Sequence, residues 1–444
     1  MKKIITINNR LHNINCKSIE LPGDKSISIR FLILSSMASG TSEARNLLKS
    51  EDTQSTINSL RKLGIKIILK KNKCKVYGKG LNGYKYKKNL ILNAGNSGTC
   101  ARLILPTLID TDYKIKITGD ESLCKRDMTR IIVPLKKFGA NIKDNKGLLP
   151  IVIDKPTKRK PINYFEKLGS AQCKSAVMIA ALKTKGTTTL KCKKSRNHSE
   201  LMFKNVLNVP MSLKETKKFD FIKIKGQKNL KSFKYNVPSD ISSASFFIAL
   251  TLLVKNSKLI LKNINTNNSR IGFIRILNMM GANIELRNKR IIKGEQVSDI
   301  YVKYVNKLKS INLNPILNSS AIDEFLLVFI IAAVSKGISK FNNLSELNKK
   351  ESKRLDWGIK ILKLMGIKVI KLKNDGIKIW GNPNLKIKKE IIIKNFLKDH
   401  RIFMVCVVAG LALGGKWKIH NPESVKTSFP QFFKIIKRVG GKLN

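Results

Sequence analysis

The chain has 444 residues, 42% of them apolar, and its 87 Lys and Arg residues outnumber 29 Asp and Glu residues to give a formal net charge of +58. This length favours two domains. The chain has no apolar run of about 18 residues, which argues against a membrane span, and no long apolar stretch after Met1, which argues against a signal peptide. The seven cysteines form no CxxC pair and the four histidines show no ligand spacing, so we expect a cytoplasmic protein with no disulfide framework, metal or cofactor.

The positive charge is spread along the whole chain. Lysine accompanies abundant Ile and Asn throughout, which indicates a compositional bias on solvated surface rather than one basic face. RNA-binding domains usually cluster Lys and Arg near exposed aromatic side chains, whereas the aromatic residues here are 7% of the chain and lie mostly in apolar runs. We therefore expect no specific nucleic-acid partner, and a basic RNA-binding protein stays as an alternative.

An apolar helical run that ends on a small residue and leads into a short strand recurs along the chain. The expected helix-ending residues, in chain order, are Gly64, Gly139, Asn208, Gly281, Gly366 and Gly440. Glycine, and after it asparagine, best adopts the left-handed conformation that closes a helix. These positions lie 69–85 residues apart, which predicts six repeats of about 74 residues.

Each repeat also contains a second, more apolar helix, followed by a small turn and a strand. In chain order such helices are expected at 29–40, 171–183, 242–255, 322–336 and 401–413, and strands at 41–47, 258–264 and 338–344. These helices have no wide polar face, so we expect them inside a domain. The sequence thus predicts an α/β fold with helices inside and sheets outside.

Six repeats in two domains imply three repeats per domain. We expect one domain at 21–237 and another formed by 1–20 plus 238–444, with ligands bound in the cleft between them. Two unrelated α/β domains with chance similarities remain as the alternative.

Polar residues at the starts of the buried helices form the candidate site. Pro22 and Gly23 form a turn that brings Lys25 and Ser26 to a helix N-terminus, with Arg30 one turn later. A helix N-terminus favours anions through its free N–H groups and its dipole, so we expect a phosphate or carboxylate seat there. Comparable polar segments start the later repeats, at 93–102, 169–175, 237–244, 322–324 and 398–401.

The segments Pro22–Arg30, Asn96–Thr99, Lys350–Arg354 and Asp399–Arg401, in this order, resemble EPSP synthase, a family of enolpyruvyl transferases, over about residues 20–440. Ser170–Lys174 and Asn267–Arg270 are similar to its class II members. The resemblance implies a two-domain enolpyruvyl-transferase-like fold built from βαβαββ-type repeats. It also implies a monomer that transfers the enolpyruvyl group of phosphoenolpyruvate to the 5-hydroxyl of shikimate 3-phosphate, a step of aromatic amino-acid biosynthesis, without a cofactor.

The resemblance also implies a role for each matching position. Shikimate 3-phosphate would be bound by Lys25, Ser26, Arg30, Ser170, Gln172, Arg196, Asp323 and Lys350. Phosphoenolpyruvate would be bound by Lys25, Asn96, Gly98, Arg126, Gln172, Arg354 and Arg401. Asp323 would accept the proton of the 5-hydroxyl, and Glu351 and Lys25 would handle the proton of the methylene carbon. Gly98 implies sensitivity to glyphosate.

Some positions carry other expectations. Asn348 and Lys353 stand where the family usually has Arg and Asp, which predicts weaker ion pairing around Arg354. Ser175 and Ser242 are expected to cap or pack helices. His198 and His400 are expected to be structural.

Two further alternatives concern activity. One is an enolpyruvyl transferase with a different acceptor, although the relative that acts on UDP-N-acetylglucosamine uses a loop Cys that has no match here. The other is a decayed, inactive member of the family.

Overall fold

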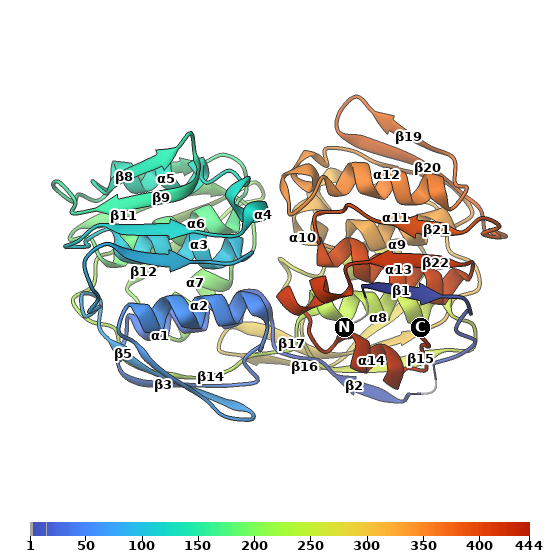
Figure 1. Ribbon diagram of the computed structural model, residues 1–444, viewed down its shortest axis with the longest axis horizontal. Helices are drawn as coiled ribbons and strands as arrows, with labels where there is room; N and C mark the ends of the chain where they lie inside the picture. Colours follow the sequence, from blue (N-terminus) through green and yellow to red (C-terminus); the bar gives the residue numbers. More distant parts are fainter. Residues whose placement is uncertain (1–2, 15) are drawn as a thin grey trace. The chain divides into compact units, whose positions relative to one another are not determined.

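The computed structural model describes residues 3–14 and 16–444, and the chain divides into two compact units (Figure 1). The first unit comprises Gly23–Val237 and Ile291–Glu295, and the second comprises Met1–Pro22, Pro238–Arg290 and Gln296–Asn444. The domain prediction also included residues 1, 2 and 15, which lie outside the described residues.

The first unit contains, within its described residues, three four-stranded sheets with the orders β14-β3-β5-β4, β6-β7-β9-β8 and β10-β11-β13-β12. Its helices are α1 (Lys25–Ser36), α2 (Glu51–Lys62), α3 (Gly98–Ile104), η1 (Leu105–Leu108), α4 (Glu121–Cys124), α5 (Thr129–Lys137), α6 (Ala171–Leu182) and α7 (His198–Asn205). Its strands are β3 (Ser39–Arg45), β4 (Lys66–Leu69), β5 (Lys73–Lys79), β6 (Leu90–Asn93), β7 (Ile115–Thr118), β8 (Asn141–Asn145), β9 (Leu148–Asp154), β10 (Asn163–Glu166), β11 (Thr187–Lys193), β12 (Met211–Glu215), β13 (Phe219–Lys225) and β14 (Lys234–Asn236).

The second unit repeats this plan in the sheets β16-β17-β15-β2, β18-β20-β19 and β1-β22-β21. Its helices are α8 (Ile241–Leu253), α9 (Gly272–Met279), η2 (Pro315–Leu317), α10 (Asn318–Ala321), α11 (Phe325–Ala333), η3 (Ser345–Lys349), α12 (Arg354–Leu364), α13 (His400–Leu413), η4 (Pro422–Thr427) and α14 (Phe432–Arg438). Its strands are β1 (Ile4–Ile7), β2 (Ser18–Glu20), β15 (Lys258–Asn265), β16 (Asn283–Ile292), β17 (Glu295–Lys303), β18 (Gly337–Phe341), β19 (Val369–Leu372), β20 (Gly376–Gly381), β21 (Ile391–Ile393) and β22 (Trp417–His420).

One repeat shows how the local order builds the sheet. Strand β6 leads into α3 and then pairs in parallel with β7, after which the chain passes through α5 into the antiparallel hairpin of β8 and β9. The same parallel crossover joins β10 to β11 through α6 and β21 to β22 through α13. This strand-helix-strand-helix-hairpin order confirms the predicted repeat and α/β fold.

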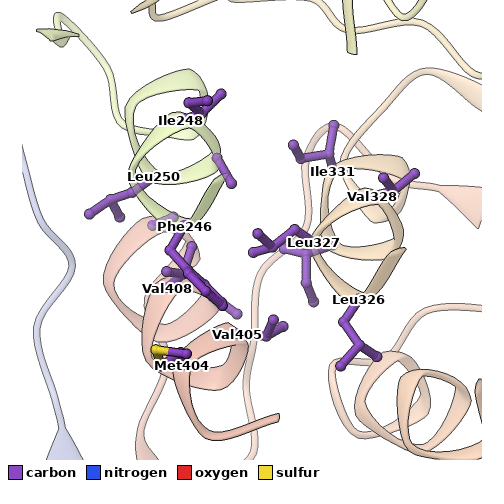
Figure 2. Close-up of a cluster of buried hydrophobic side chains, with 14 of the residues drawn as sticks. Phe246, Ile248, Leu250, Leu326, Leu327, Val328, Ile331, Met404, Val405 and Val408 are labelled. Carbon is purple, nitrogen blue, oxygen red and sulfur yellow. The ribbon is translucent and has the colours of Figure 1, made fainter. Parts of the chain in front are cut away.

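The central helices of each unit are buried, as their lack of a polar face predicted. Every residue of α8 and of α11 is buried. Figure 2 shows side chains of α8, α11 and α13 facing one another in the core of the second unit, among them Phe246, Leu327 and Val405. Because burying such a side chain contributes about 1.5–3 kcal/mol, these helices hold their unit together while the sheets lie outside them.

The helix-ending residues also behave as predicted. Gly64, Gly139, Gly281, Gly366 and Gly440 have φ between 82° and 97°, and Asn208 has φ of 50°. The helix N-terminus predicted at Lys25 and Ser26 is confirmed, because α1 begins at Lys25 after the Asp24 cap, and the apolar run expected at 29–40 continues from it. The predicted start of the helix at 322 was wrong, because α11 begins only at Phe325. The late start of α11 leaves Asp323 in the turn that precedes the helix.

Among the described residues, no single helix is long and apolar enough to cross a membrane, although the bent pair Pro315–Ala321 and Phe325–Ala333 passes that test by length and composition.

Candidate functional site

The predicted site residues fall into two groups, one in each unit. The first unit holds Lys25, Ser26, Arg30, Asn96, Gly98, Arg126, Ser170, Gln172 and Arg196, and the second holds Asp323, Lys350, Glu351, Arg354 and Arg401.

The N-terminus of α1 brings three predicted residues together. Asp24 caps the helix by accepting a hydrogen bond from Ile27 N at 2.9 Å. Lys25 Nζ lies 3.0 Å from Asp52 Oδ2, and its side chain keeps 18% exposure. Arg30 Nη1 donates to Ser26 O at 3.0 Å. Lys25 therefore remains accessible to an anion at a helix N-terminus, where the free N–H groups favour negative charge.

Two serines hold the Arg30 guanidinium. Arg30 Nε donates to Ser199 Oγ and Nη2 donates to Ser175 Oγ, both at 2.9 Å. Burial, with a smaller contribution from the positive charge of Arg196, outweighs the raising effect of nearby carboxylates and lowers the pKa of Arg30 to about 10. At this pKa the guanidinium is still protonated at neutral pH, so it can pair with a phosphate.

Gly98, the first residue of α3, lies beside two arginines. A Cβ atom at this position would come 2.7 Å from Arg102 Nη1 and 3.4 Å from Arg126 Nη1. Arg126 Nη2 donates to Asn96 Oδ1 at 2.7 Å, and Asn96 in turn donates to Asp120 Oδ2 at 2.7 Å. The missing side chain of Gly98 thus leaves room for the arginines and the backbone N–H groups of the turn.

Gln172 joins this cluster from the start of α6. Arg102 Nη1 donates to Gln172 Oε1 at 2.9 Å, and Gln172 Nε2 donates to Thr99 Oγ1 at 2.9 Å. Ser170 caps α6 by accepting from Cys173 N at 3.2 Å. The bond between Gln172 and Thr99 therefore links the N-termini of α6 and α3, and Arg102, which was not among the predicted site residues, adds a second link.

Asp323 lies among cations in the second unit. Its Oδ1 atom is 3.3 Å from Lys350 Nζ and 3.4 Å from Arg354 Nη1. Arg401 Nη1 donates to the backbone O of Asp323 at 3.0 Å, and its Nη2 is 4.0 Å from Asp323 Oδ2. Asp323 is not the N-cap residue of α11, because that position belongs to Glu324.

Arg354 is buried and surrounded by carboxylates. Arg354 Nε donates to Asp399 Oδ2 at 2.9 Å, and Nη2 donates to Glu351 Oε2 at 2.5 Å. Burial works against the charge of Arg354, but Asp399, Glu351 and Asp323 raise its pKa above the ordinary value. Asn348 and Lys353 therefore do not leave Arg354 without ion pairs.

Asp399 is the second residue whose part the sequence analysis missed. It caps α13 by accepting from Arg401 N at 3.0 Å, and Ser352 Oγ also donates to it at 2.9 Å. One fully buried carboxylate thus fixes both Arg354 and the first turn of the helix that carries Arg401. The position of Asp399 in the Asp-His-Arg motif is the sequence signal that could have identified it as a site residue.

Two serines expected to cap or pack helices are buried inside helices and do not cap them. Ser175 lies inside α6 and accepts from Arg30. Ser242 Oγ donates to Glu324 Oε1 at 2.5 Å and accepts from Arg270 Nη2 at 2.9 Å, which makes it part of a buried polar network. His198 is buried 2.6 Å from Glu295 and His400 is buried 3.2 Å from Thr427 Oγ1, as expected of structural residues.

The described residues contain no group of three or more His, Cys, Asp or Glu side chains that could hold a metal ion. Both groups instead present guanidinium and ammonium donors, which suit carboxylate and phosphate ligands.

The chain is similar to known proteins over nearly its whole length. The family model described as EPSP synthase (3-phosphoshikimate 1-carboxyvinyltransferase) matches residues 13–436. Relatives named 3-phosphoshikimate 1-carboxyvinyltransferase are 38% identical over 424 residues in Endomicrobium trichonymphae and 40% identical over 425 residues in Sulfurihydrogenibium sp., each covering 95% of this chain and 96% of the relative.

Solved structures agree with the sequence relatives. EPSP synthase from Acinetobacter baumannii is 33% identical with a TM-score of 0.85, covering 100% of this chain and 99% of that one. The enolpyruvyl transferase NikO from Streptomyces tendae has a TM-score of 0.77 at 11% identity, over 100% of this chain and 99% of that one, and shares the fold.

Proposed function

This chain belongs to the EPSP synthase (3-phosphoshikimate 1-carboxyvinyltransferase) family, and on that premise we propose which of its residues carry each part of the reaction. The enzyme transfers the enolpyruvyl group of phosphoenolpyruvate to the 5-hydroxyl of shikimate 3-phosphate. The products are 5-enolpyruvylshikimate 3-phosphate and phosphate, and the step belongs to aromatic amino-acid biosynthesis.

Shikimate 3-phosphate is proposed to take its phosphate contacts from the first unit. Lys25, Ser26 and Arg30 start α1, and Ser170 and Gln172 start α6, with Arg196 adding a further positive charge. The support is chemical, because a phosphate dianion matches helix N–H groups and a protonated guanidinium. Asp323 and Lys350 of the second unit are proposed to contact the ring hydroxyls.

Phosphoenolpyruvate is proposed to use the arginines of both groups. Arg126, Gly98 and Asn96 form one cluster, and Arg354 and Arg401 form the other. Lys25 and Gln172 complete the proposed set. Arginine pairs suit this substrate because they grip its carboxylate and phosphate while charge moves between atoms.

The proposed reaction has two steps, an addition and an elimination. Asp323 accepts the proton of the 5-hydroxyl while that oxygen attacks C2 of phosphoenolpyruvate, and the C3 methylene takes a proton from Lys25 or Glu351 to become a methyl group. In the second step the methyl group returns its proton to the group that supplied it, the C2–O bond to phosphate breaks, and the departing phosphate takes the proton that Asp323 had accepted. Protons and bonds balance over the two steps, so no cofactor is required.

The contact of Asp323 with Lys350, Arg354 and Arg401 is the observation that carries this proposal. In the proposal, the cations around Asp323 hold the anionic substrates next to this carboxylate, which places it to accept the proton of the 5-hydroxyl.

Acceptor profiling tests the proposed acceptor. Purified enzyme with phosphoenolpyruvate is expected to consume shikimate 3-phosphate and to leave UDP-N-acetylglucosamine unchanged, with products identified by mass spectrometry. Turnover of the sugar nucleotide instead would support the related transferase.

We propose a cytoplasmic monomer. Each of the seven cysteines, all within the described residues, is a free thiol, which supports a reducing compartment. Sedimentation velocity tests the monomer, and a stable dimer at micromolar concentration would contradict it.

A further inference from the structure

One sheet of the first unit carries phenylalanine rings beside lysines on its outer face. In the strand registers of β10-β11-β13-β12, Phe165 pairs with Lys191, Lys191 with Phe221, and Phe221 with Lys214. Residues directly opposite each other project from the same face of a sheet. Phe165 and Phe221 are 38% and 39% exposed, so this row of alternating rings and ammonium groups faces solvent.

Lys191 lies at the centre of this row. Its Nζ atom is 4.9 Å, 4.8 Å and 5.6 Å from the ring centroids of Phe165, Phe219 and Phe221. Cation–π attraction at these distances keeps the ammonium group over the rings. The Phe–Lys face is defined here as Phe165, Lys191, Lys214, Phe219, Phe221 and Lys223.

The carboxylates of these four strands belong to the opposite face. Glu166, Cys192, Asp220 and Glu215 form one register row that alternates with the Phe–Lys row. Asp220 and Glu215 pair there with Lys194, at 2.5 Å and 3.2 Å. Since β10, β11, β12 and β13 as described contain no other Asp or Glu, their outer face carries positive charge without acidic neighbours from the strands.

We propose that the Phe–Lys face binds single-stranded RNA. Lysines neutralise backbone phosphates, and unstacked bases stack on exposed aromatic rings. A four-stranded sheet with two or three exposed aromatic residues is a platform on which RNA bases stack. The adjacent register row contains Asn163, Thr189 and Ser212, whose amide and hydroxyl groups can bond to a 2′-hydroxyl.

The overall net charge does not single out this face, but the aromatic rings do. On the sheet β18-β20-β19 of the second unit, the single ring of Trp380 is shared by Lys378 of β20, at 4.8 Å, and by Lys368, which directly precedes β19, at 5.0 Å. The expectation of no specific nucleic-acid partner relied on aromatics that lie in apolar runs, whereas Phe165 and Phe221 of the Phe–Lys face are exposed. The Trp380 sheet therefore provides a matched control.

Fluorescence anisotropy with a labelled uridine oligonucleotide of about 12 nucleotides tests the proposal. Phe165→Leu/Phe221→Leu is expected to raise Kd at least about thirtyfold, because it removes two stacked bases that contribute at least about 1 kcal/mol each. Trp380→Leu should bind like the wild type. Carboxyvinyltransferase activity should be unchanged in both variants and shows that they are folded.

A pair of charge variants separates a specific face from general attraction. Lys191→Gln/Lys223→Gln should weaken RNA binding more than Lys340→Gln/Lys378→Gln, which removes the same charge from the control sheet. Lys191→Gln/Lys223→Gln should also reduce the slope of log Kd against log salt concentration by about 2. Equal losses in the two variants would overturn the proposal.

Three other outcomes would overturn it. Wild-type affinity of the double Phe variant would reduce binding to charge alone. Equal affinity for single-stranded DNA of the same sequence would remove the assignment to RNA. If the double Phe variant lost binding to phosphatidylserine vesicles but still bound RNA like the wild type, the face would be assigned to a membrane surface.

Discussion

Arg354 Nε donates to Asp399 Oδ2 at 2.9 Å, and both side chains are buried. Asp399 also caps α13, the helix that begins with His400 and Arg401. One carboxylate therefore holds the Arg354 guanidinium and the backbone at Arg401, the two arginines proposed to bind phosphoenolpyruvate. This arrangement makes Asp399 important for stability as well as for binding.

Asp399→Asn is expected to lower the free energy of unfolding by about 3–5 kcal/mol at pH 7, because it leaves Arg354 buried with less compensating charge. Urea denaturation gives this difference. Asp356→Asn, which removes an exposed carboxylate 2.7 Å from Lys371, should change it by no more than about 1 kcal/mol. Equal effects of the two variants would contradict the structural role of Asp399.

The difference between wild type and Asp399→Asn should depend on pH. Burial raises the pKa of Asp399, but the charge and hydrogen bonds of Arg354 bring it below its ordinary value. The folded state therefore binds fewer protons than the unfolded state, so the stabilisation is present above about pH 4 and is lost as the pH falls through the folded pKa. A difference that grows on acidification from pH 5 would have the wrong sign.

Lys174→Met should destabilise the first unit. Lys174 Nζ is fully buried 2.5 Å from Glu200 Oε1 and 3.8 Å from Asp220 Oδ2. Removing it leaves buried carboxylates uncompensated, with an expected loss of about 3–5 kcal/mol in thermal or urea unfolding. Lys174→Met/Glu200→Gln should recover part of that loss, and a double variant less stable than the single one would argue against this cause.

Gly98→Ala should weaken phosphoenolpyruvate binding. The new methyl group would displace Arg102, whose Nη1 lies 2.7 Å from the Cβ position, and would thereby disturb Arg126. We expect kcat/KM for phosphoenolpyruvate to fall about tenfold to a hundredfold. The wild type is expected to be inhibited by glyphosate and the variant less so. Full turnover of the wild type at millimolar glyphosate would contradict the expected inhibition. An unchanged KM for phosphoenolpyruvate in Gly98→Ala would contradict the proposed role of Gly98.

Ser175→Ala should raise KM for shikimate 3-phosphate about fivefold, because it removes a hydrogen bond of about 1 kcal/mol that positions Arg30. Ser35→Ala is the matched control, since Ser35 is a buried serine of α1 whose Oγ bonds to Leu32 O. Steady-state kinetics with varied shikimate 3-phosphate distinguish them. The same KM in both variants would show that Ser175 does not position Arg30.

The repeats could be predicted from sequence because their signals are local. A glycine or asparagine that closes a helix, such as Gly64 or Asn208, acts within one turn of chain. The start of α11 was predicted too early because the apolar pattern continues through Ile322. Periodicity identifies an element better than it locates its ends.

The contacts within the site could not be predicted in the same way. Arg102 reaches Gln172 across 70 residues, and Arg401 reaches Asp323 across 78. Such pairs depend on how repeats pack, which local spacing does not encode. Motif resemblance identified Asp323 and Arg401 as site residues, but it gave no partner to Arg102 or Asp399.

Phosphate release from purified enzyme tests the central claim most directly. With phosphoenolpyruvate, release should require shikimate 3-phosphate and should fall at least a hundredfold in Asp323→Ala, because general base catalysis contributes about 10²–10⁴-fold. Release without the acceptor, or wild-type release from Asp323→Ala, would contradict the proposed base. No release from folded wild-type enzyme would contradict the activity itself.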